Sequence, residues 1–298
     1  HFESGGVNPY VARPASVEAF LPISALVALK SWIGTGVFDA VHPAGLTMLL
    51  AIVGVSALYG RGVCSWLCPV GTMSEGLARA GRVAFGRNLG MPPLLDWPLR
   101  GAKYLLLFFF LWAILWEMGA AEATLFLHGP YNMVADVKML KFFTSPPGEV
   151  VAFLVALALL SMLFANFWCR YLCPYGALLG LAGLLSPVKV TRNADRCTGC
   201  GLCTVACPNR IQVSRASRVR SPECTGCLEC VVACPRRGAL GVALPWRGPV
   251  LPDWTLPALL LGTFLLALVA AQVLGHWESR VTYQEYEWLI PRAGQFSH

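Results

Sequence analysis

Two runs of four cysteines carry the clearest chemical signal in this sequence of 298 residues. In each run, two-residue spacers separate the first three cysteines, a three-residue spacer precedes the fourth, and a proline follows. Short spacers of this kind wrap the backbone around a small cube, so that three thiolates face three of its irons. The fourth thiolate, next to the proline, is carried away to a second cube. The spacing therefore predicts two [4Fe–4S] clusters.

The same geometry assigns ligands to each cluster. Cluster one takes three cysteines of the first run and the last of the second, namely Cys197, Cys200, Cys203 and Cys234. Cluster two takes the remaining four, namely Cys224, Cys227, Cys230 and Cys207. Gly199, Gly201 and Gly226 have no side chain, so we expect the backbone to come close there and to donate N–H groups to sulfide.

Two other interpretations of these cysteines are less favoured. Paired C-x2-C units also form tetrahedral zinc sites, but zinc does not explain two runs of four that both end in Cys-Pro. A disulfide framework requires an oxidising compartment, whereas we expect this segment to face a reducing one. The double run is typical of two-cluster bacterial ferredoxins.

Four further cysteines form two pairs with a shared pattern. Cys64 and Cys68 lie in C-S-W-L-C-P-V-G, and Cys169 and Cys173 lie in C-R-Y-L-C-P-Y-G. In a helical turn, residues i and i+4 lie on one face, so each pair can present two sulfurs together. We expect the proline that follows each pair to break the helix. The repetition indicates duplicated helix pairs whose cysteines lie at one membrane depth.

The role of these paired cysteines stays open between three alternatives. Four thiolates meeting at one place are a sufficient set of ligands for a third [4Fe–4S] cluster. They could instead act as redox-active thiols or as a site for a soft metal ion such as copper. The third alternative is that they are buried and inert.

The elements that position these cysteines are predicted to be membrane helices. Hydrophobic residues make up 56% of the chain and charged residues only 13%, about half the share in a globular domain. Residues 40–60, 150–169 and 254–277 contain no charged side chain, and a run from Tyr104 to Leu127 is interrupted only by Glu117 and Glu122. Each is long enough to cross a bilayer, which takes about 20 residues.

A fifth apolar segment, residues 17–38, contains Lys30 together with Pro22 and two glycines. A lysine at the centre of a span costs about 2.5–3.5 kcal/mol, so we expect a helix lying in the membrane interface, with a fifth span as the alternative. The chain begins at His1 without an initiator Met, so we also expect a preceding segment, such as another helix, in the natural protein.

The distribution of positive charge predicts the orientation. Of the 23 Lys and Arg, 6 lie in residues 61–103 and 11 in residues 170–253, whereas residues 1–43, 104–149 and 278–298 hold 2 each. Segments rich in Lys and Arg remain on the cytoplasmic side. The cysteine-rich segments are therefore expected inside, with the N-terminal segment and the C-terminal tail outside. The net charge of +7 reflects this topology and gives no indication of nucleic-acid binding.

The expected fold is an all-α polytopic membrane protein of four to five transmembrane helices, with an inserted bacterial ferredoxin-like α+β domain for two [4Fe–4S] clusters. Four parts follow along the chain. Residues 1–43 form an outer segment with an interfacial helix, residues 44–186 the helices with the two C-x3-C-P motifs, residues 187–247 the ferredoxin-like insert, and residues 248–298 the last span and an outer tail.

Few other side chains indicate chemistry. The chain has no C-x-x-C-H motif and so encodes no covalently attached haem. His42 and His128 fall near the expected outer edge, where they could bind a quinone head group or a haem, although capping a helix or lining the interface is the simpler interpretation. Glu117 and Glu122 are functional candidates because they are ionisable and lie within an expected span. No catalytic residue is assigned.

The four cysteine groups together resemble those of the NapH/NosR-type membrane polyferredoxins. The matching features are the C-x3-C-P motifs at Cys64/Cys68 and Cys169/Cys173, followed by the ferredoxin run from Cys197 to Cys234. The resemblance covers roughly residues 40–240. It implies an iron–sulfur subunit of the bacterial inner membrane, resembling a quinol dehydrogenase, with quinone and haem-containing or other redox subunits as partners. The span and tail after the insert depart from the pattern and leave the partner open.

We therefore expect a one-electron relay between the membrane quinone pool and a partner redox protein. The alternative from a different class is a copper reductase or assembly factor that uses the thiols of the C-x3-C-P motifs. A scaffold that merely contains clusters is the third and least favoured hypothesis, since strongly reducing clusters seldom serve only to hold a fold together.

Overall fold

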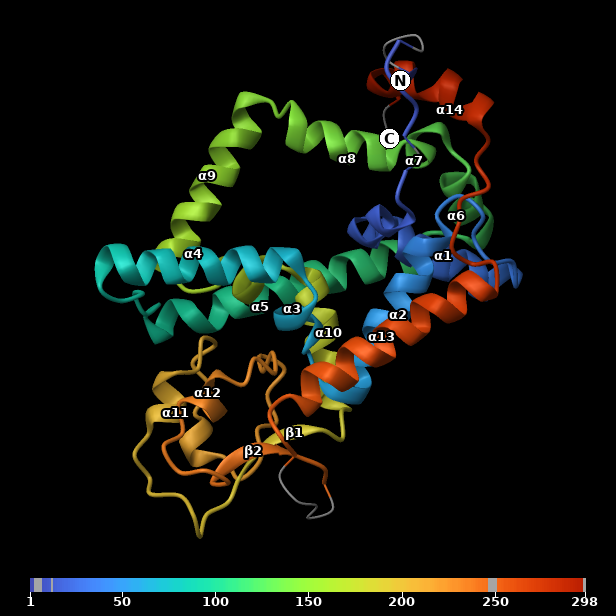
Figure 1. Ribbon diagram of the computed structural model, residues 1–298. Helices are drawn as coiled ribbons and strands as arrows, with labels where there is room; N and C mark the ends of the chain where they lie inside the picture. The colour runs from blue at the N-terminus through green and yellow to red at the C-terminus, as the bar shows by residue number, and fades with distance from the viewer. Residues whose placement is uncertain (3–6, 12, 246–250, 297–298) are drawn as a thin grey trace. The chain divides into compact units, whose positions relative to one another are not determined.

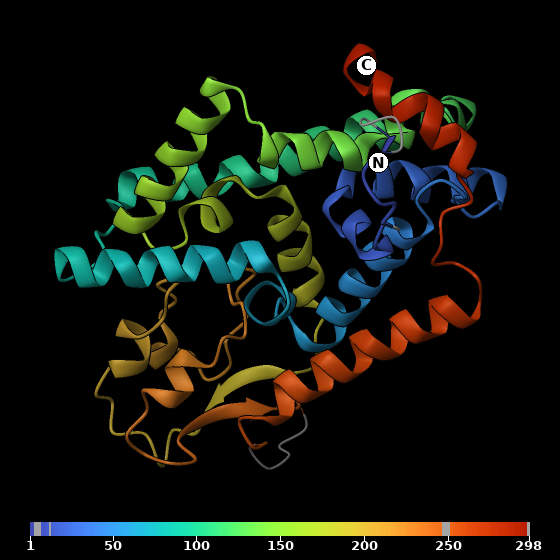
Figure 2. The ribbon, with the colours of Figure 1, turned by 45° about the horizontal axis from the view of Figure 1, so that its top comes forward.

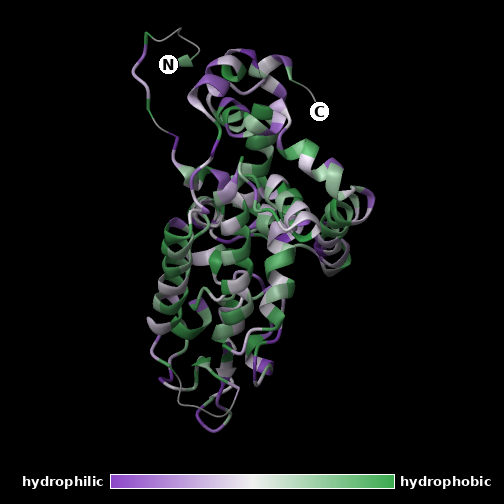
Figure 3. Ribbon diagram, turned by 90° about the vertical axis from the view of Figure 1, so that its right-hand side faces the viewer, coloured by the Kyte–Doolittle hydropathy of each residue, from purple (hydrophilic) through white to green (hydrophobic). Residues whose placement is uncertain are grey.

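The computed structural model describes residues 1–2, 7–11, 13–245 and 251–296 of the chain. The expected boundary between the insert and the last helix, at residues 247–248, lies outside these ranges. The described chain is mostly helical, and hydrophobic residues run along most of the helices (Figure 3).

Two of the described helices are long and apolar enough to cross a membrane, at Leu94–Glu117 and Thr255–Val273. A third candidate consists of the helices Ala135–Thr144 and Gly148–Leu163 taken together, which are bent by 75° at their junction. The apolar helices Pro43–Tyr59 and Pro174–Leu184 are shorter. The structure thus supports two or three spans, fewer than the four to five expected.

The candidate span near residue 100 differs from the one expected at Tyr104–Leu127. Its helix begins earlier, because α5 (Pro93–Leu111) continues into a π-helical segment (Trp112–Glu117). The chain is extended at Gly119, and α6 (Ala120–Leu127) begins there as a separate helix. Glu122 explains the new start, since its carboxylate accepts the Gly119 N–H at 2.8 Å and so satisfies a free backbone donor at the beginning of α6.

Contact clustering divides the chain into two compact units. The first comprises His1–Ala51, Phe108–Ala152 and Leu266–His298, and the second comprises Ile52–Leu107 and Phe153–Leu265. The helices α2 (Pro43–Tyr59), α5, α9 (Gly148–Leu163) and α13 (Thr255–Val273) each contribute residues to both units.

The regular elements in the described part of the first unit are all helices. Helices α6, α7 and α8 follow one another through residues 120–144. The helices that belong wholly to this unit are α1 (Pro22–Thr35), α6 (Ala120–Leu127), α7 (Pro130–Met133), α8 (Ala135–Thr144) and α14 (Tyr283–Leu289). Its apolar core lies where α1 packs on α6, with Val27, Ala28 and Leu127 fully buried.

A buried polar network lies beside this core. Glu18 accepts a hydrogen bond from Arg13 at 2.6 Å and from the Gly45 N–H at 2.9 Å. Arg13 also donates to Asp136 at 2.9 Å. These paired charges fix the 3-10 helix Ala15–Phe20 against α2 and α8. Buried charges are tolerated here because each faces an opposite charge.

The second unit contains the cysteines. Its wholly internal helices are α3 (Val63–Trp66), α4 (Pro69–Phe85), α10 (Pro174–Leu184), α11 (Leu202–Val205) and α12 (Glu229–Val232). The sequence predicted a surface helix around Arg79 and Arg82, and α4 fulfils this prediction. Figure 1 labels these elements along the chain.

The insert is small and of mixed α and β structure. Strands β1 (Lys189–Arg192) and β2 (Leu240–Ala243) pair antiparallel, with Lys189 opposite Ala243 and Arg192 opposite Leu240 (Figure 2). The one-turn helices α11 and α12 lie between the strands in sequence. Val190 and Val242 of the sheet join Val213, Val219, Leu228 and Cys230 in one apolar core. This core holds the two cysteine runs in place.

Candidate iron–sulfur sites

The four cysteines expected for cluster two line one cavity of about 360 Å³. Cys207 comes from the first run, and Cys224, Cys227 and Cys230 come from the second. Apolar side chains of the core, including Val190, Val213 and Leu228, complete the wall. Cys207, the fourth cysteine of the first run, therefore lies with three cysteines of the second, and their joint binding of one cluster stays a prediction.

The four cysteines expected for cluster one line a second cavity, of about 370 Å³. Cys197, Cys200 and Cys203 share it with Cys234 of the other run. Here Arg192, Arg236 and Ser214 line the cavity together with the apolar Ala239 and Leu240. Cys200 is exposed, whereas Cys230 of the first cavity is buried.

The backbone between the cysteines takes the left-handed conformation that the wrapping requires. Gly199, Gly201 and Gly226 have φ angles of 72°, 75° and 62°, and Leu228 adopts 63°. Glycine reaches this region without the steric cost that a Cβ imposes. The turns direct the N–H of Gly199 toward Cys197 and that of Gly226 toward Cys224. We expected N–H groups close to the clusters at these glycines.

The electrostatic environments of the two cavities are opposite. The N–H of Gly199 and the Arg192 guanidinium lower the pKa of the Cys197 thiol, because both stabilise its thiolate. Burial raises the pKa of Cys230 to about 12, and the neighbouring Cys224 and Cys227 thiols raise it further. Among the described residues, two guanidinium groups thus line the cavity of cluster one, whereas no charged side chain lines that of cluster two.

The two C-x3-C-P motifs have matching local structures. Cys68 precedes α4 and Cys173 precedes α10, and in both cases the next residue is a proline at the first helical position. In both cases the preceding helical segment ends before the proline, as expected, and the proline then begins the next helix. Proline lacks an N–H and has a fixed φ, which suits it to begin a helix. Each motif also contains a backbone hydrogen bond that spans five residues. Cys68 N–H donates to the Val63 carbonyl, and Cys173 N–H donates to the Trp168 carbonyl.

Glycine is needed two residues after each of these prolines. A Cβ on Gly71 would lie 2.0 Å from the Cys64 carbonyl oxygen, and one on Gly176 would lie 2.4 Å from the Arg61 guanidinium. Real Cβ atoms do not approach so closely. The glycine of the pattern C-P-x-G thus lets the start of each helix pack closely against neighbouring atoms of the motif region.

The four thiols of the two motifs come close to one another, as the repeat predicts. Burial raises the pKa of Cys169 to about 12, and the Cys173, Cys64 and Cys68 thiols all raise it further. Arg61 connects the two motifs, because its Nε donates to Cys64 Sγ at 3.3 Å and its Nη2 donates to the Cys169 carbonyl at 3.1 Å.

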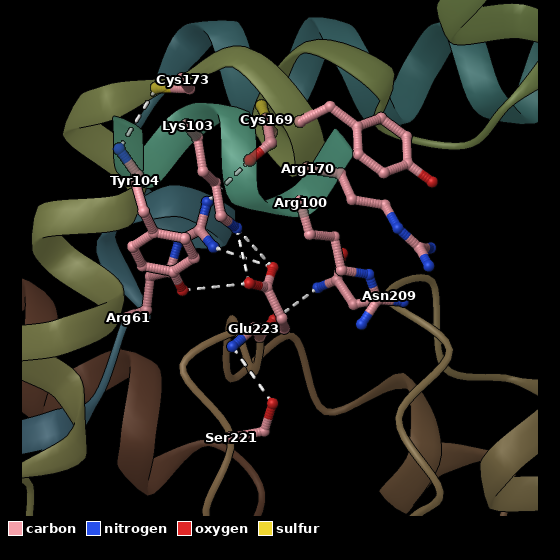
Figure 4. Close-up of polar contacts among 12 residues, drawn as sticks. Arg61, Arg100, Lys103, Tyr104, Cys169, Arg170, Cys173, Asn209, Ser221 and Glu223 are labelled. Atoms are coloured by element: carbon pink, nitrogen blue, oxygen red, sulfur yellow. Dashed lines mark hydrogen bonds and ion pairs between the residues drawn. The ribbon is translucent and has the colours of Figure 1, made fainter. Parts of the chain in front are cut away.

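A buried ion-pair network joins Arg61 to the insert (Figure 4). At its centre, Glu223 accepts from the ammonium of Lys103 at 2.6 Å through both of its carboxylate oxygens. Tyr104 donates to the same carboxylate at 3.2 Å, and an Arg61 nitrogen lies 3.7 Å away. The side chains of Lys103 and Glu223 are only 0% and 8% exposed. Glu223 immediately precedes Cys224, so the network fixes a ligand of cluster two relative to α5.

A large cavity, of about 1570 Å³, lies between the thiols of the C-x3-C-P motifs and those expected for cluster two. Cys64 and Cys169 of the C-x3-C-P motifs line it, and so do Cys207 and Cys227 of cluster two. Arg61 and Asn166 lie on its wall as well. The two groups of thiols therefore face the same space.

The remaining candidates have structural partners. His42 is buried, with Nε2 2.7 Å from the Asn132 carbonyl and Nδ1 3.3 Å from Glu18. His128 ends α6, and its ring contacts the Thr124 carbonyl. Glu117 accepts a hydrogen bond from the Trp112 indole at 2.9 Å, and Glu122 caps α6. These contacts agree with the simpler interpretation given for the histidines.

Sequence reasoning did not identify Arg61, Lys103 and Glu223. The available signal was weak: Arg61 lies three residues before Cys64, Glu223 directly precedes Cys224, and Lys103 opens an apolar run. A lysine at the start of an expected span is easily attributed to the membrane interface.

The two insert cavities fit the cluster that the cysteine spacing implies. Each presents four thiols and backbone N–H groups within one enclosed space, the donor set of a [4Fe–4S] cube. In the described part of the chain, no three His, Cys, Asp or Glu side chains lie close enough to share a single metal ion. A cube holds its thiolates on separate corners, farther apart than the ligands of one ion.

Comparison with known proteins adds independent findings. The model of a 4Fe-4S binding domain matches residues 41–92 and 147–193, and that of a 4Fe-4S dicluster domain matches residues 189–235. These ranges include all twelve cysteines. The chain therefore binds [4Fe–4S] clusters. No solved structure matches the chain.

Several curated proteins are similar to the chain. YccM of Escherichia coli, named as an electron transport protein, is 41% identical over the whole chain and 85% of its own length. The methylamine utilization ferredoxin-type protein MauN of Paracoccus denitrificans is 32% identical over 50% of the chain and 48% of MauN. The regulatory protein NosR of Pseudomonas aeruginosa is 30% identical over 50% of the chain, but the chain spans only 20% of NosR.

Proposed function

This chain belongs to the NapH/NosR-type family of membrane polyferredoxins, and we propose that it relays single electrons between the membrane quinone pool and a partner redox protein. Its relatives are electron transport proteins, and its fold supplies apolar helices long enough to cross a membrane. Bound [4Fe–4S] clusters supply the one-electron chemistry. The protein's own side chains hold the clusters and set their surroundings.

One observation supports the relay above all others. Three sets of four thiols lie in one compact unit, and thiols of cluster two share a cavity with those of the C-x3-C-P motifs. Cys64, Cys68, Cys169 and Cys173 would hold a third [4Fe–4S] cluster at the membrane face. That cluster would continue the path from the insert into the membrane, toward quinone or toward haem in an adjacent subunit.

The proposed topology follows from the charge distribution. The insert and the C-x3-C-P motifs would lie on the cytoplasmic side of the bacterial inner membrane, with the N-terminal segment and the C-terminal tail outside. In this arrangement α2, α5, α9 and α13 would each cross the bilayer. The shorter helices would span with the help of flanking residues and local thinning. The division at residues 43, 186 and 247 belongs to the same proposal.

The test begins with total iron and acid-labile sulfide per chain, on protein purified without oxygen. We expect about 12 irons, three cubes' worth. The double variant Cys64→Ser/Cys169→Ser should retain about 8 irons. Its insert clusters should still be reduced by dithionite but no longer by a short-chain quinol. Ser65→Ala, a neighbour of Cys64 that does not bind the cluster, is the matched control.

Two results would contradict the relay. Iron near zero with stoichiometric zinc would exclude the clusters themselves. Reduction of the double variant by quinol at the wild-type rate would show that the C-x3-C-P thiols do not lie on the electron path.

A second function, copper reduction during assembly of another enzyme, is favoured by the openness of one site. Without a third cube, Cys64 and Cys169 are soft donors on the wall of a large cavity. In that case the wild type should contain about 8 irons. It should also compete with a chelator for one Cu(I), and lose this ability when the four C-x3-C-P cysteines become Ser.

A further inference from the structure

Five arginines line the cavity of cluster one or directly adjoin a lining residue in sequence, and are here called the arginine rim: Arg192, Arg196, Arg215, Arg236 and Arg237. Two of them, Arg192 and Arg236, line the cavity beside the cysteines. Arg215 follows Ser214, which lines it too. Arg196 precedes Cys197, and its guanidinium lies against Gly238. A Cβ added to that glycine would be 2.8 Å from Arg196 Nη1.

The charge of the arginine rim is not neutralised within the insert. Arg196, Arg215, Arg236 and Arg237 are exposed, and among the described residues none of them forms an ion pair. The described insert contains only three acidic residues. Glu223 is occupied by Lys103, and Glu229 lies 3.8 Å from Arg79. Only Asp195 remains close to the rim in sequence.

We propose that the arginine rim is the docking surface for an acidic, soluble electron-carrier protein that exchanges single electrons with cluster one. This proposal rests on the relay function. It adds the site at which a soluble partner protein exchanges electrons with the relay. One electron passes between the carrier's own redox centre and the cluster held by Cys197, Cys200, Cys203 and Cys234. One centre is oxidised and the other reduced, and no covalent bond changes.

The exposure of the site favours cluster one as the contact point. Cys200 is exposed, and its two neighbours, Gly199 and Gly201, have no side chain. A partner surface can therefore approach the cluster without displacing bulky side chains. A rim of uncompensated positive charge raises the encounter rate with an acidic partner and orients it before contact.

The kind of cation favours a protein partner over lipid head groups. Eight of the nine Lys and Arg in residues 187–245 are Arg. Protein interfaces are enriched in Arg and depleted in Lys, because the planar guanidinium loses less freedom per hydrogen bond and binds carboxylates in pairs. Attraction to anionic lipid is electrostatic and is served by either residue.

The test measures the rate at which a reduced, acidic plant-type ferredoxin reduces the full chain in nanodiscs of zwitterionic lipid. For the wild type, we expect the rate to fall steeply as salt rises, since screening weakens the steering. The double variant Arg196→Glu/Arg237→Glu should react about tenfold more slowly at low salt and should lose the salt dependence. The matched control Arg220→Glu reverses an exposed arginine of the same insert outside the rim and should change the rate less than about twofold.

Two readouts separate docking from damage. Iron content should be equal in all variants. Reduction by methyl viologen radical, a small cation, should be unchanged or faster in the double variant, because the charge that repels it has been removed. A slow reaction with both reductants would indicate a damaged cluster site and would overturn the proposal.

Other outcomes also contradict the docking surface. The double variant could react with ferredoxin at the wild-type rate, or no more slowly than Arg220→Glu. Alternatively, the double variant could react more slowly than the wild type only in nanodiscs that contain phosphatidylglycerol. In that case the rim binds lipid. Reduction by quinol does not depend on the rim. If quinol failed to reduce the wild type, the relay itself would be refuted. If quinol reduced the wild type but the ferredoxin test failed, only the docking surface would be refuted.

Discussion

The two cluster cavities of the insert have the same cysteine spacing but contrasting surroundings. Cluster two is enclosed by the valines of the sheet and is connected through Glu223 to Lys103 and Arg61. Cluster one lies among arginines and has an exposed ligand, Cys200. Both sites can hold the same cube. What differs is the solvent, the charge and the packing around it.

This difference indicates how one motif serves two tasks. Hydrogen bonds, net charge and solvent exposure set the potential of an iron–sulfur cluster. A buried site connected to α5 suits transfer toward the membrane, and an exposed cationic site suits exchange with soluble protein. The ligand spacing therefore determines which cofactor binds, and the residues between the ligands determine what the cofactor contacts.

Replacing one ligand in each cavity should give the largest contrast. Cys230→Ser should remove cluster two, about 4 irons, and should also destabilise the insert. The reason is that a serine hydroxyl at this buried position lacks a partner, which costs about 1–3 kcal/mol. Cys200→Ser should remove cluster one with little further loss, because the new hydroxyl faces water. Iron analysis and limited proteolysis measure the two effects.

The comparison would fail if Cys200→Ser made the insert as sensitive to protease as Cys230→Ser does. In that case, the clusters themselves, and not the packing around them, would hold the insert together.

Removing the ammonium beside Glu223 should have the next largest effect, confined to the side of cluster two. Lys103→Met leaves a buried carboxylate with Arg61 as its only remaining cation in the described network. Breaking a buried pair in this way costs about 3–5 kcal/mol. We expect cluster two to be lost to an iron chelator much faster than in the wild type, with cluster one unchanged, as followed by electron paramagnetic resonance.

The double variant Lys103→Met/Glu223→Gln is the matched control for that experiment. It removes both charges and should recover part of the stability, because the two effects are coupled. If the double variant were less stable than Lys103→Met, the pair would not be the source of the effect.

A single hydrogen bond should give the smallest contrast. The Trp66 indole donates to the Gly226 carbonyl at 3.0 Å, within the turn whose N–H faces Cys224. Trp66→Phe removes that bond, worth about 1 kcal/mol. The potential of cluster two should therefore shift by no more than about 40 mV. A redox titration of the full chain should show no change at cluster one, and an equal shift at both would contradict this account.

Local cysteine patterns predicted much of the site. The spacing of the runs from Cys197 to Cys234 predicts that the fourth cysteine of each run binds with three of the other run. The lining of the two cavities is compatible with that assignment, which stays a prediction. The C-x3-C-P repeat predicted two motifs with close thiols, and the structure gives both motifs the same helix start. These features depend on contacts within about ten residues, or on a repeat, so the sequence contains them directly.

Contacts distant in sequence were not predictable in this way. Lys103 and Glu223 are 120 positions apart, and a lone lysine before an apolar run resembles an interface anchor. The ends of the helices were also misplaced, because apolar composition does not reveal a cap such as the Glu122 carboxylate at the Gly119 N–H. The shortness of α2 and α9 has the same origin. In both, the apolar sequence continues past the residue at which the helix ends.

The Lys103–Glu223 pair has a consequence for the biogenesis of the protein. Lys103 belongs to a helix long enough to cross the membrane, whereas Glu223 belongs to a segment that folds around iron and sulfide. Until the insert has folded, the helix carries a lysine without its carboxylate, and an unpartnered charge is costly in a membrane helix. We expect membrane proteases to distinguish chains with an unfolded insert from mature ones at this point.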